Sequence, residues 1–202
     1  MNVEKINSAL RSLSPQEIVE WAFSLKKKTV VTTNFRPYEA AILHAVSSVK
    51  SDTTVIWCDT GYNTSYTYIH AREVIDLLHL NIDLYVPQQT VANRNVALGI
   101  PEVDDPKHAI FTEQVKLEPF ARAMKEHEPE LWFTNLRKDQ TAFRNSLDIV
   151  SLSKDGVIKV SPFYHYSDTE MDAYLAENKL PNEFKYYDPT KVLENRECGL
   201  HS

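Results

Sequence analysis

Apolar and polar positions recur with two different periods along the chain, and these periods predict strands that alternate with helices. Short apolar runs rich in β-branched residues at 29–33, 53–58, 82–86 and 131–134 are typical of buried strands. After the first two runs, apolar residues recur at helical spacing, first at Tyr38, Ala41, Ile42, Ala45, Val46 and Val49, and then at Ile69, Val74, Ile75 and Leu78. Strands that alternate with helices imply a single α/β domain with a mainly parallel sheet and helices on both faces.

Capping and turn signals mark further elements. Ser14-Pro15-Gln16-Glu17 and Ser167-Asp168-Thr169-Glu170 are capping boxes, which predict helices up to about Leu25 and toward Glu177. Pro119 to Glu128 is also expected to be helical. Strands at 149–153 and 157–160 flank Lys154-Asp155-Gly156 and predict a hairpin. The stretch 87–110 has no periodicity, and a lid and a disordered loop are equally compatible with it.

Charge and hydropathy exclude several classes of function. Lys and Arg number 22 against 28 Asp and Glu, a formal net charge of −6, whereas a sequence-independent nucleic-acid or membrane-surface binder needs a basic field. No apolar run reaches the roughly 20 residues that span a bilayer, and no signal segment follows Met1. We therefore expect a cytoplasmic protein that binds neither nucleic acid nor membrane and holds any anionic substrate with a local basic cluster.

The chain has two cysteines, Cys58 and Cys198, too few and too far apart for a disulfide scaffold. Cys58 ends a predicted strand and is expected to be a small buried apolar side chain. Cys198 lies near Arg196 and His201, which favour the thiolate, although Glu197 opposes them. A spare thiol without a function is the alternative interpretation of Cys198.

Two loops after predicted strands carry candidate anion-binding groups. The first contains Thr32, Thr33, Asn34, Phe35 and Arg36 and leads into a helix, whose N-terminus favours an anion. An ordinary capped turn is the alternative there, since the glycines of phosphate loops are missing.

The second loop follows the run at 131–134. Its candidate residues are Asn135, Arg137, Lys138, Gln140 and Arg144, and its arginines could bind phosphate with paired hydrogen bonds. A solvated basic helix face is the alternative interpretation of this cluster.

The terminal Arg196-Glu197-Cys198-Gly199-Leu200-His201 resembles the Arg-Glu-Cys-Gly-(Leu/Ile)-His tail of the 3′-phosphoadenylyl sulfate (PAPS) reductases. Three further segments resemble family motifs in the family's order: Asp59-Thr60-Gly61-Tyr62, Lys116-Leu117-Glu118-Pro119 and Leu136-Arg137-Lys138-Asp139-Gln140. The resemblance extends from about residue 30 to the end of the chain. It departs from the family at Arg36 and Asn135, both of which stand where the family has Gly, so that Arg36 is expected to supply a charge contact instead.

The resemblance implies an adenine-nucleotide α-hydrolase-like fold with a mobile C-terminal tail. It divides the single domain into an N-terminal helix at 1–28, a nucleotide-binding α/β core at 29–183 and a catalytic tail at 184–202. It implies Cys198 as the nucleophile, with Arg196 and His201 beside it. The residues expected to bind substrate are Thr32, Thr33, Asn34, Phe35, Arg36, Asp59, Thr60, Gly61, Lys116, Asn135, Arg137, Gln140, Arg144 and Lys191.

The implied reaction is the thiol-dependent reduction of PAPS to sulfite and adenosine 3′,5′-bisphosphate through an S-sulfocysteine on Cys198. Thioredoxin or glutaredoxin is the implied external reductant. No iron–sulfur cluster is expected, because the related adenylyl sulfate (APS) reductases hold theirs with four cysteines and this chain has two. A cluster-free APS reductase and a non-catalytic nucleotide-binding module are the alternatives. The oligomeric state stays open, with a homodimer as one option.

Overall fold

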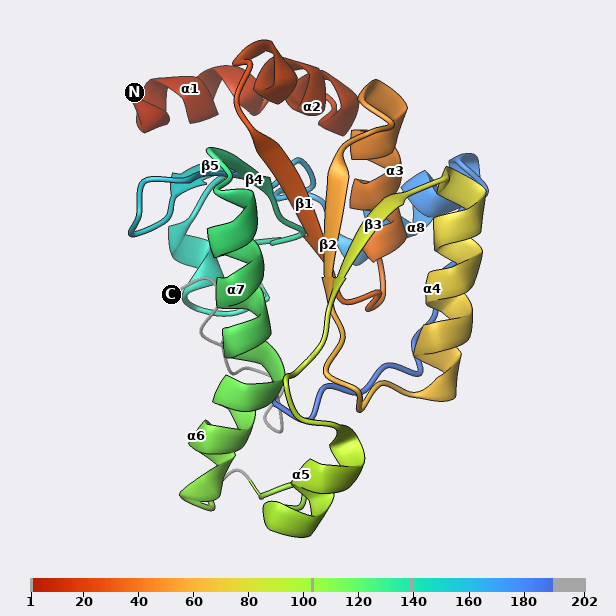
Figure 1. Ribbon diagram of the computed structural model, residues 1–202. Helices are drawn as coiled ribbons and strands as arrows, with labels where there is room; N and C mark the ends of the chain where they lie inside the picture. Colours follow the sequence, from red (N-terminus) through yellow and green to blue (C-terminus); the bar gives the residue numbers. More distant parts are fainter. Residues whose placement is uncertain (1, 103, 139, 191–202) are drawn as a thin grey trace.

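A six-stranded sheet organises the computed structural model, which describes residues 2–102, 104–138 and 140–190 (Figure 1). The strand order is β3-β2-β1-β4-β6-β5. All neighbouring strands are parallel except β5 and β6, which form the predicted antiparallel hairpin. The strands are β1 (Thr29–Thr33), β2 (Thr54–Cys58), β3 (Asn81–Tyr85), β4 (Leu131–Phe133), β5 (Val150–Leu152) and β6 (Ile158–Val160). The predicted α/β class and mainly parallel sheet are confirmed.

Helices connect most of the strands. They are α1 (Val3–Leu10), α2 (Pro15–Ser24), α3 (Glu39–Val49), α4 (Ser65–Leu78), α5 (Val91–Ala97), α6 (Lys107–Thr112), α7 (Glu118–His127) and α8 (Asp168–Glu177). Both predicted capping boxes are present, at Ser14 before α2 and at Ser167 before α8. None of the helices in the described part of the chain is long and apolar enough to cross a membrane.

The two faces of the sheet pack against different helices, as the period-2 alternation of strand side chains requires. Val31 of β1 belongs to the larger core, to which α2, α3, α4 and α8 contribute. Val30, its neighbour in sequence, packs on the opposite face in a smaller cluster with Trp132 and Ala123 of α7. Figure 1 shows α7 on one side of the sheet and α3, α4 and α8 on the other.

The segment expected as one N-terminal helix at 1–28 holds two helices, and the first of them, α1, covers the β5 edge of the sheet. The Asn7 side chain donates from Nδ2 to the Val150 carbonyl at 2.9 Å and accepts from the Val150 amide at 2.8 Å. Asn7 therefore takes the place of a neighbouring strand at this position of β5. Pairing the exposed backbone groups in this way protects an edge strand from association with other chains.

The stretch 87–110 holds two short helices, α5 and α6, so the prediction of a disordered loop is wrong for its described residues. The Thr90 hydroxyl caps α5 by accepting from the Asn93 amide. The sequence shows no apolar period here because α5 buries Arg94, a charged residue, and exposes Val96. A lid function for this stretch stays a prediction.

A π-helical turn, η1 (Glu113–Leu117), joins α6 to α7 in one continuous helical segment. Pro119 follows it and lacks the N–H that an α-helix would direct to the Val115 carbonyl, and its ring crowds that carbonyl. A widened turn accommodates both effects. The widened turn carries Lys116, whose side chain is buried.

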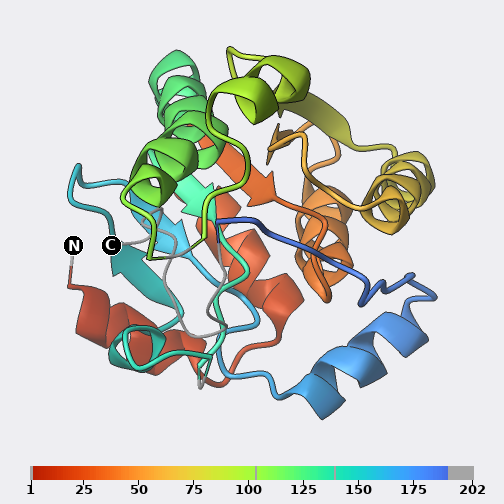
Figure 2. The ribbon, with the colours of Figure 1, turned by 90° about the horizontal axis from the view of Figure 1, so that it is seen from below.

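The chain changes direction across the sheet next to β1. It runs outward from β1 through β2 to β3 and then returns to place β4 on the other side of β1. Ligands of open α/β sheets bind at the carboxyl ends of the strands at such a point. Figure 2 looks onto these carboxyl ends and shows the segment that follows α8 crossing over them.

Candidate functional site

The loop after β1 is closed around an internal carboxylate. The buried Glu39 side chain accepts from the Thr33 hydroxyl at 2.8 Å and from the Asn34 amide at 2.7 Å. The Thr33 hydroxyl in turn accepts from the amide of Phe35, which has a positive φ of 53°. The loop therefore has the donor groups of an anion site, and Glu39 occupies some of them.

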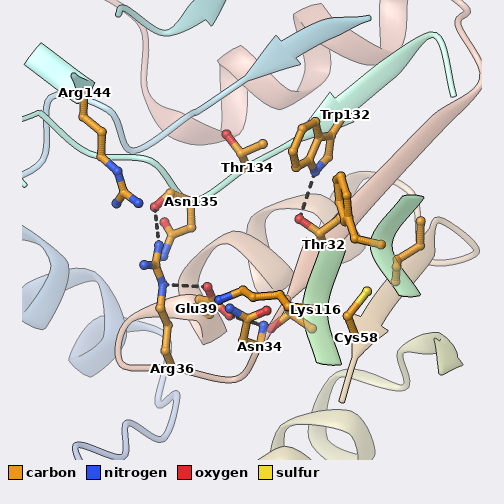
Figure 3. Close-up of a pocket in the computed structure, with 13 residues that line it drawn as sticks. Thr32, Asn34, Arg36, Glu39, Cys58, Lys116, Trp132, Thr134, Asn135 and Arg144 are labelled. Carbon is orange, nitrogen blue, oxygen red and sulfur yellow. Dashed lines mark hydrogen bonds and ion pairs between the residues drawn. The ribbon is translucent and has the colours of Figure 1, made fainter. Parts of the chain in front are cut away.

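Arg36 joins this loop to the loop after β4. Its Nε donates to Glu39 Oε1 at 2.8 Å, and its Nη2 donates to the Asn135 carbonyl at 3.1 Å. Figure 3 shows this side chain extending from the first loop to the second. Arg36, which stands where the resemblance expects a glycine, thus connects the two candidate loops.

A cavity lies between the two loops, at the carboxyl ends of β1, β2 and β4 (Figure 3). Its volume is about 40 Å³, room for roughly three water molecules. Arg36, Asn135 and Arg144 lie at one end, and Thr32, Trp132 and Cys58 lie toward the other (Figure 3). The lining residues are Thr32, Thr33, Asn34, Arg36, Glu39, Ile56, Cys58, Lys116, Phe120, Trp132, Thr134, Asn135 and Arg144. The cavity is therefore basic at one end and aromatic and aliphatic at the other.

A second, wider cavity of about 550 Å³ shares Arg36 and Arg144 with the first. Arg137, Lys138, Gln140 and His165 also line it. Gln140 Oε1 accepts from both the Arg137 amide and the Arg144 guanidinium and holds the two residues together. The second loop thus forms a basic wall rather than a solvated helix face.

Arg137 is fixed by an ion pair and a ring contact. Its Nη2 lies 2.6 Å from Asp168 Oδ1, and its guanidinium carbon lies 4.9 Å from the centre of the Tyr38 ring. Burial, followed by the charge of Asp168, raises the pKa of the Tyr38 hydroxyl. Tyr38 is therefore a neutral platform for the guanidinium at neutral pH.

Lys116 enters the site from the π-helical turn and forms a buried ion pair with Asp188. The Lys116 ammonium also donates to the Thr190 hydroxyl at 3.2 Å. Burial alone would raise the pKa of Asp188, but the charge of Lys116 and the hydrogen bonds from Lys116 and Thr190 lower it. Asp188 is thus held as a carboxylate against Lys116.

Two buried polar atoms of the site lack a partner within residues 2–102, 104–138 and 140–190. One is the acceptor Oδ1 of Asn135, in the wall of the first cavity, and the other is the donor Nε of Arg137. A buried polar atom without a partner loses its hydration without compensation. A bound molecule with both donors and acceptors would satisfy these two groups.

Cys58 is half-buried and lines the first cavity rather than lying fully in the core. Burial raises the pKa of its thiol to about 12, although Lys116 and Arg122 act in the opposite direction. The expectation of an apolar, unreactive role for Cys58 agrees with this protonated state.

The Asp59-Thr60-Gly61-Tyr62 loop is built around its own carboxylate. Asp59 Oδ1 accepts from the Gly61 amide and the Asn63 side chain at 2.8 Å each, and from the Tyr68 hydroxyl at 2.9 Å. Gly61 has a φ of +79°, which a residue with a Cβ adopts only under strain. Asp59 and Gly61 thus shape the loop, and of this loop only Thr60 lines a described cavity.

The structure brings most of the expected substrate-binding residues to one edge of the sheet. Those that line the first cavity are Thr32, Thr33, Asn34, Arg36, Lys116, Asn135 and Arg144. Arg137 and Gln140 line the second cavity. The Phe35 side chain packs instead in the core against Trp57, so that only its backbone faces the loop. Lys191, Arg196, Cys198 and His201 lie outside the described residues, as does the part of the expected mobile tail from 191 to 202.

Several lining residues were not identified from the sequence. Ile56 and Trp132 belong to the same face of the sheet as Val30, and Phe120 follows the proline of α7. The strand period of Ile56 and Trp132 was visible in the sequence, but the strand order that places β4 beside β1 was not. Glu39 was also missed, because an internal carboxylate in an anion loop has no sequence signal of its own.

Comparisons with known proteins relate the chain to one family. Residues 28–187 match the model of the phosphoadenosine phosphosulfate reductase domain. A phosphoadenosine 5′-phosphosulfate reductase from Aliivibrio salmonicida is 34% identical, and the match covers 100% of this chain and 88% of that protein. The corresponding protein from Vibrio cholerae is 32% identical over 90% of this chain and 72% of its own length.

Solved structures agree with the sequence comparisons. The phosphoadenylyl-sulfate reductase from Candida auris, in a phosphate complex, has a TM-score of 0.78 at 26% identity, covering 89% of this chain and 87% of that chain. An NH3-dependent NAD synthetase from Campylobacter jejuni has a TM-score of 0.57 at 12% identity, covering 92% and 77%. The second likeness concerns the fold alone, and the two together agree with the expected adenine-nucleotide α-hydrolase-like fold.

Proposed function

Because the chain belongs to the phosphoadenosine phosphosulfate reductase family, we propose that it reduces PAPS to sulfite and adenosine 3′,5′-bisphosphate with a thiol as the nucleophile. It is an oxidoreductase of sulfate assimilation. The observation that carries the proposal for this site is the meeting of Arg36, Arg144 and Lys116 around one cavity at the carboxyl ends of β1 and β4. In an acidic chain, this local cluster supports the binding of a polyanionic nucleotide.

The two ends of the first cavity match the chemistry of the two halves of a nucleotide, and the cavity must widen to admit one. The Trp132 and Phe120 rings, 5.2 Å apart between centres, form an apolar wall for a base. The Asn135 Oδ1 acceptor would take a hydrogen bond from an N–H or O–H group of the nucleoside. The phosphate and sulfate groups would then point to the basic end, where Arg36 and Arg144 also border the wider cavity.

The chemical step assigned to Cys198 is an attack of its thiolate on the sulfuryl sulfur of PAPS. A bond forms between the cysteine sulfur and the sulfuryl sulfur, and the bond from that sulfur to the phosphate oxygen breaks. The leaving group is adenosine 3′,5′-bisphosphate, and the cysteine becomes an S-sulfocysteine. Lys116, Arg137, Arg144 and Arg196 would stabilise the negative charge on the leaving phosphate, and His201 would contact the sulfate or steer Cys198.

An external dithiol of the thioredoxin or glutaredoxin type would complete the cycle. One of its thiolates attacks the sulfur of Cys198, sulfite leaves, and a mixed disulfide forms. The second thiolate of the partner then attacks that disulfide, regenerates the Cys198 thiolate and leaves the partner oxidised by two electrons. Cys58, with its pKa of about 12, is a poor resolving thiol, which supports an external reductant. Two cysteines are too few for a four-thiolate cluster, so the proposal includes none.

The proposal also assigns a role to each segment of the chain. Residues 1–28 form the N-terminal helical segment, whose first helix covers the β5 edge of the sheet, 29–183 form the nucleotide-binding core, and 184–202 carry the nucleophile. Arg36 and Glu39 shape the nucleotide loop, whereas Asp59 and Gly61 act through the backbone of the neighbouring loop.

The test measures sulfite release from PAPS with thioredoxin, for the wild type and for Cys198→Ser. We expect the variant to lose turnover while its affinity for adenosine 3′,5′-bisphosphate stays within a few-fold, because a serine hydroxyl is protonated at neutral pH. Intact mass after mixing wild type with PAPS, without reductant, should show one added SO₃ group on Cys198. A label on Cys58, or turnover by the serine variant, would contradict the assignment, and binding without turnover would favour a nucleotide-binding module.

A further inference from the structure

The ion pair between Lys116 and Asp188 connects the candidate catalytic site with the segment that leads to Cys198. Lys116 and Asp188 are 4% and 5% exposed at their side chains. The Thr190 amide and hydroxyl both donate to Asp188 Oδ1, at 3.0 and 2.6 Å. Lys116 thus binds Oδ2 of a carboxylate whose Oδ1 is held by the segment's own backbone and hydroxyl.

The pair neutralises a cation that an anionic nucleotide would use. An ammonium group has three N–H donors, and Asp188 and Thr190 together engage two of them. A phosphate or sulfate oxygen that takes the position of Asp188 Oδ2 would restore the neutral pairing of Lys116. The carboxylate and the nucleotide anion therefore compete for the same ammonium group.

Lys116 also forms a wall of two neighbouring cavities. The first cavity, of about 40 Å³, and a smaller cavity of about 10 Å³ share Asn34, Cys58 and Lys116 as walls. Asp188, Tyr186 and Tyr187 close the smaller cavity from the side of the segment that crosses the strand ends (Figure 2). Neither cavity alone admits a nucleotide. Separation of Lys116 from Asp188 would join the two spaces.

The position of Asp188 in the chain links the ion pair to the segment that leads to Cys198. Cys198 follows Asp188 by ten positions, so Asp188 anchors the start of the segment that carries the nucleophile. Ten residues span at most about 33–36 Å when extended. If Asp188 is released, the stretch of chain that leads to Cys198 is no longer anchored at position 188.

We propose that Asp188 is a positioning residue whose carboxylate stands in for the substrate anion on Lys116 in the empty enzyme. Nucleotide binding displaces the carboxylate, joins the two cavities and frees residues 188–190. The anchor at residues 188–190, from which the chain continues toward Cys198, is thereby released only when the nucleotide is present. This inference rests on the proposed function, because a nucleotide anion is the competitor that it requires.

The first test titrates adenosine 3′,5′-bisphosphate into the full-length protein by calorimetry. Asp188→Asn keeps the shape of the side chain and removes its charge. It should tighten nucleotide binding by about three- to tenfold, because the nucleotide anion no longer competes with a carboxylate for the charge of Lys116. In a Lys116→Met background the same substitution should change the affinity by less than about twofold. Asp155→Asn, in the distant hairpin turn, should leave the affinity unchanged.

The double substitution separates this role from a structural one. If Asp188 only stabilised the fold, its loss would weaken nucleotide binding in both backgrounds. Should Asp188→Asn fail to fold, Thr190→Val removes a hydroxyl that holds the carboxylate and should tighten binding in the same direction, by a smaller factor. Unchanged or weaker binding in the Asp188 variant, or in the Thr190 variant where that one is used, overturns the proposal.

The second test follows amide hydrogen exchange of residues 186–190 in the wild type. Exchange should become faster when the protein is saturated with adenosine 3′,5′-bisphosphate, because the contacts of Asp188 with Lys116 are lost. Slower exchange with nucleotide would overturn the proposal. If the wild type does not bind the nucleotide at all, the proposed function fails. If it binds the nucleotide and reduces PAPS but Asp188→Asn does not tighten binding, this inference alone fails.

Discussion

At the scale of single residues, three cations of the site are held by carboxylates of the chain itself. Arg36 pairs with Glu39, Lys116 with Asp188, and Arg137 with Asp168. A buried cation without a partner would destabilise the fold by several kcal/mol, so these carboxylates let an empty site keep its cations in place. An incoming anion must exchange with them, and its net binding free energy is smaller than the sum of its contacts.

The same burial makes a testable distinction between the two cysteines. Because burial raises the pKa of Cys58 to about 12, only about one molecule in ten thousand carries the Cys58 thiolate at pH 8. We expect iodoacetamide to leave Cys58 unmodified in the native protein between pH 7 and 9, while Cys198 is alkylated. Peptide mass analysis gives the extent at each site. Unfolding in urea, the control, should expose Cys58 to the reagent, and rapid native labelling of Cys58 would show that its pKa is not raised.

At the scale of elements, the predictable parts are those that local sequence determines. The capping boxes at Ser14 and Ser167 and the β-branched run at 29–33 specify their elements through their own hydrogen bonds and side-chain shapes. The burial of Arg94 depends instead on a hydrogen bond from its Nε to Gln114, twenty positions further along the chain, so its segment shows no apolar period. The π-helical turn does have a local cause in Pro119, but no period marks it, and only the Lys-x-Glu-Pro resemblance pointed to this place.

The loop with Gly61 illustrates how an element depends on contacts that sequence does not show. A Cβ on Gly61 would lie 2.6 Å from Val91 Cγ2 of α5, and its φ is +79°. Gly61→Ala should therefore destabilise the loop by more than the ~1 kcal/mol that positive φ alone costs an alanine, and should weaken nucleotide binding. Urea denaturation and calorimetry would measure both effects.

Gly156 is the matched control for this substitution. It has a φ of +81°, but nothing lies within 4 Å of the Cβ that alanine would add. Gly156→Ala therefore bears the backbone strain without the clash, and the difference between the two variants reports the contact with α5. Equal losses of stability would mean that the Val91 side chain moves aside freely.

At the scale of the whole molecule, the strand order determines where the sequence motifs meet. The return of the chain to place β4 beside β1 brings the loops at Asn34 and Asn135 together across an otherwise acidic protein. The motifs were visible one by one in the sequence, and the family resemblance supplied their common purpose. Which cation faces which cavity follows only from the three-dimensional arrangement, as Lys185 shows. It lies 4.0 Å from the Tyr66 ring centre and lines neither of the two cavities that hold Arg36.

This arrangement bears on the choice between PAPS and APS, which differ by the 3′-phosphate. That group carries a charge of about −1.5 to −2, and each charge-assisted hydrogen bond to it contributes on the order of 1.5–3 kcal/mol, enough for tenfold discrimination. Arg36 borders both cavities and is the cation that we expect to contact the 3′-phosphate.

We predict a kcat/KM at least about tenfold higher for PAPS than for APS, a preference that weakens as salt screens the charges. Arg36→Ala should reduce the preference, and Lys185→Ala should leave it intact. Comparable kcat/KM values for the two nucleotides at low ionic strength would contradict the assignment, and a preference lost in the Lys185 variant instead would place the 3′-phosphate beside the segment after α8.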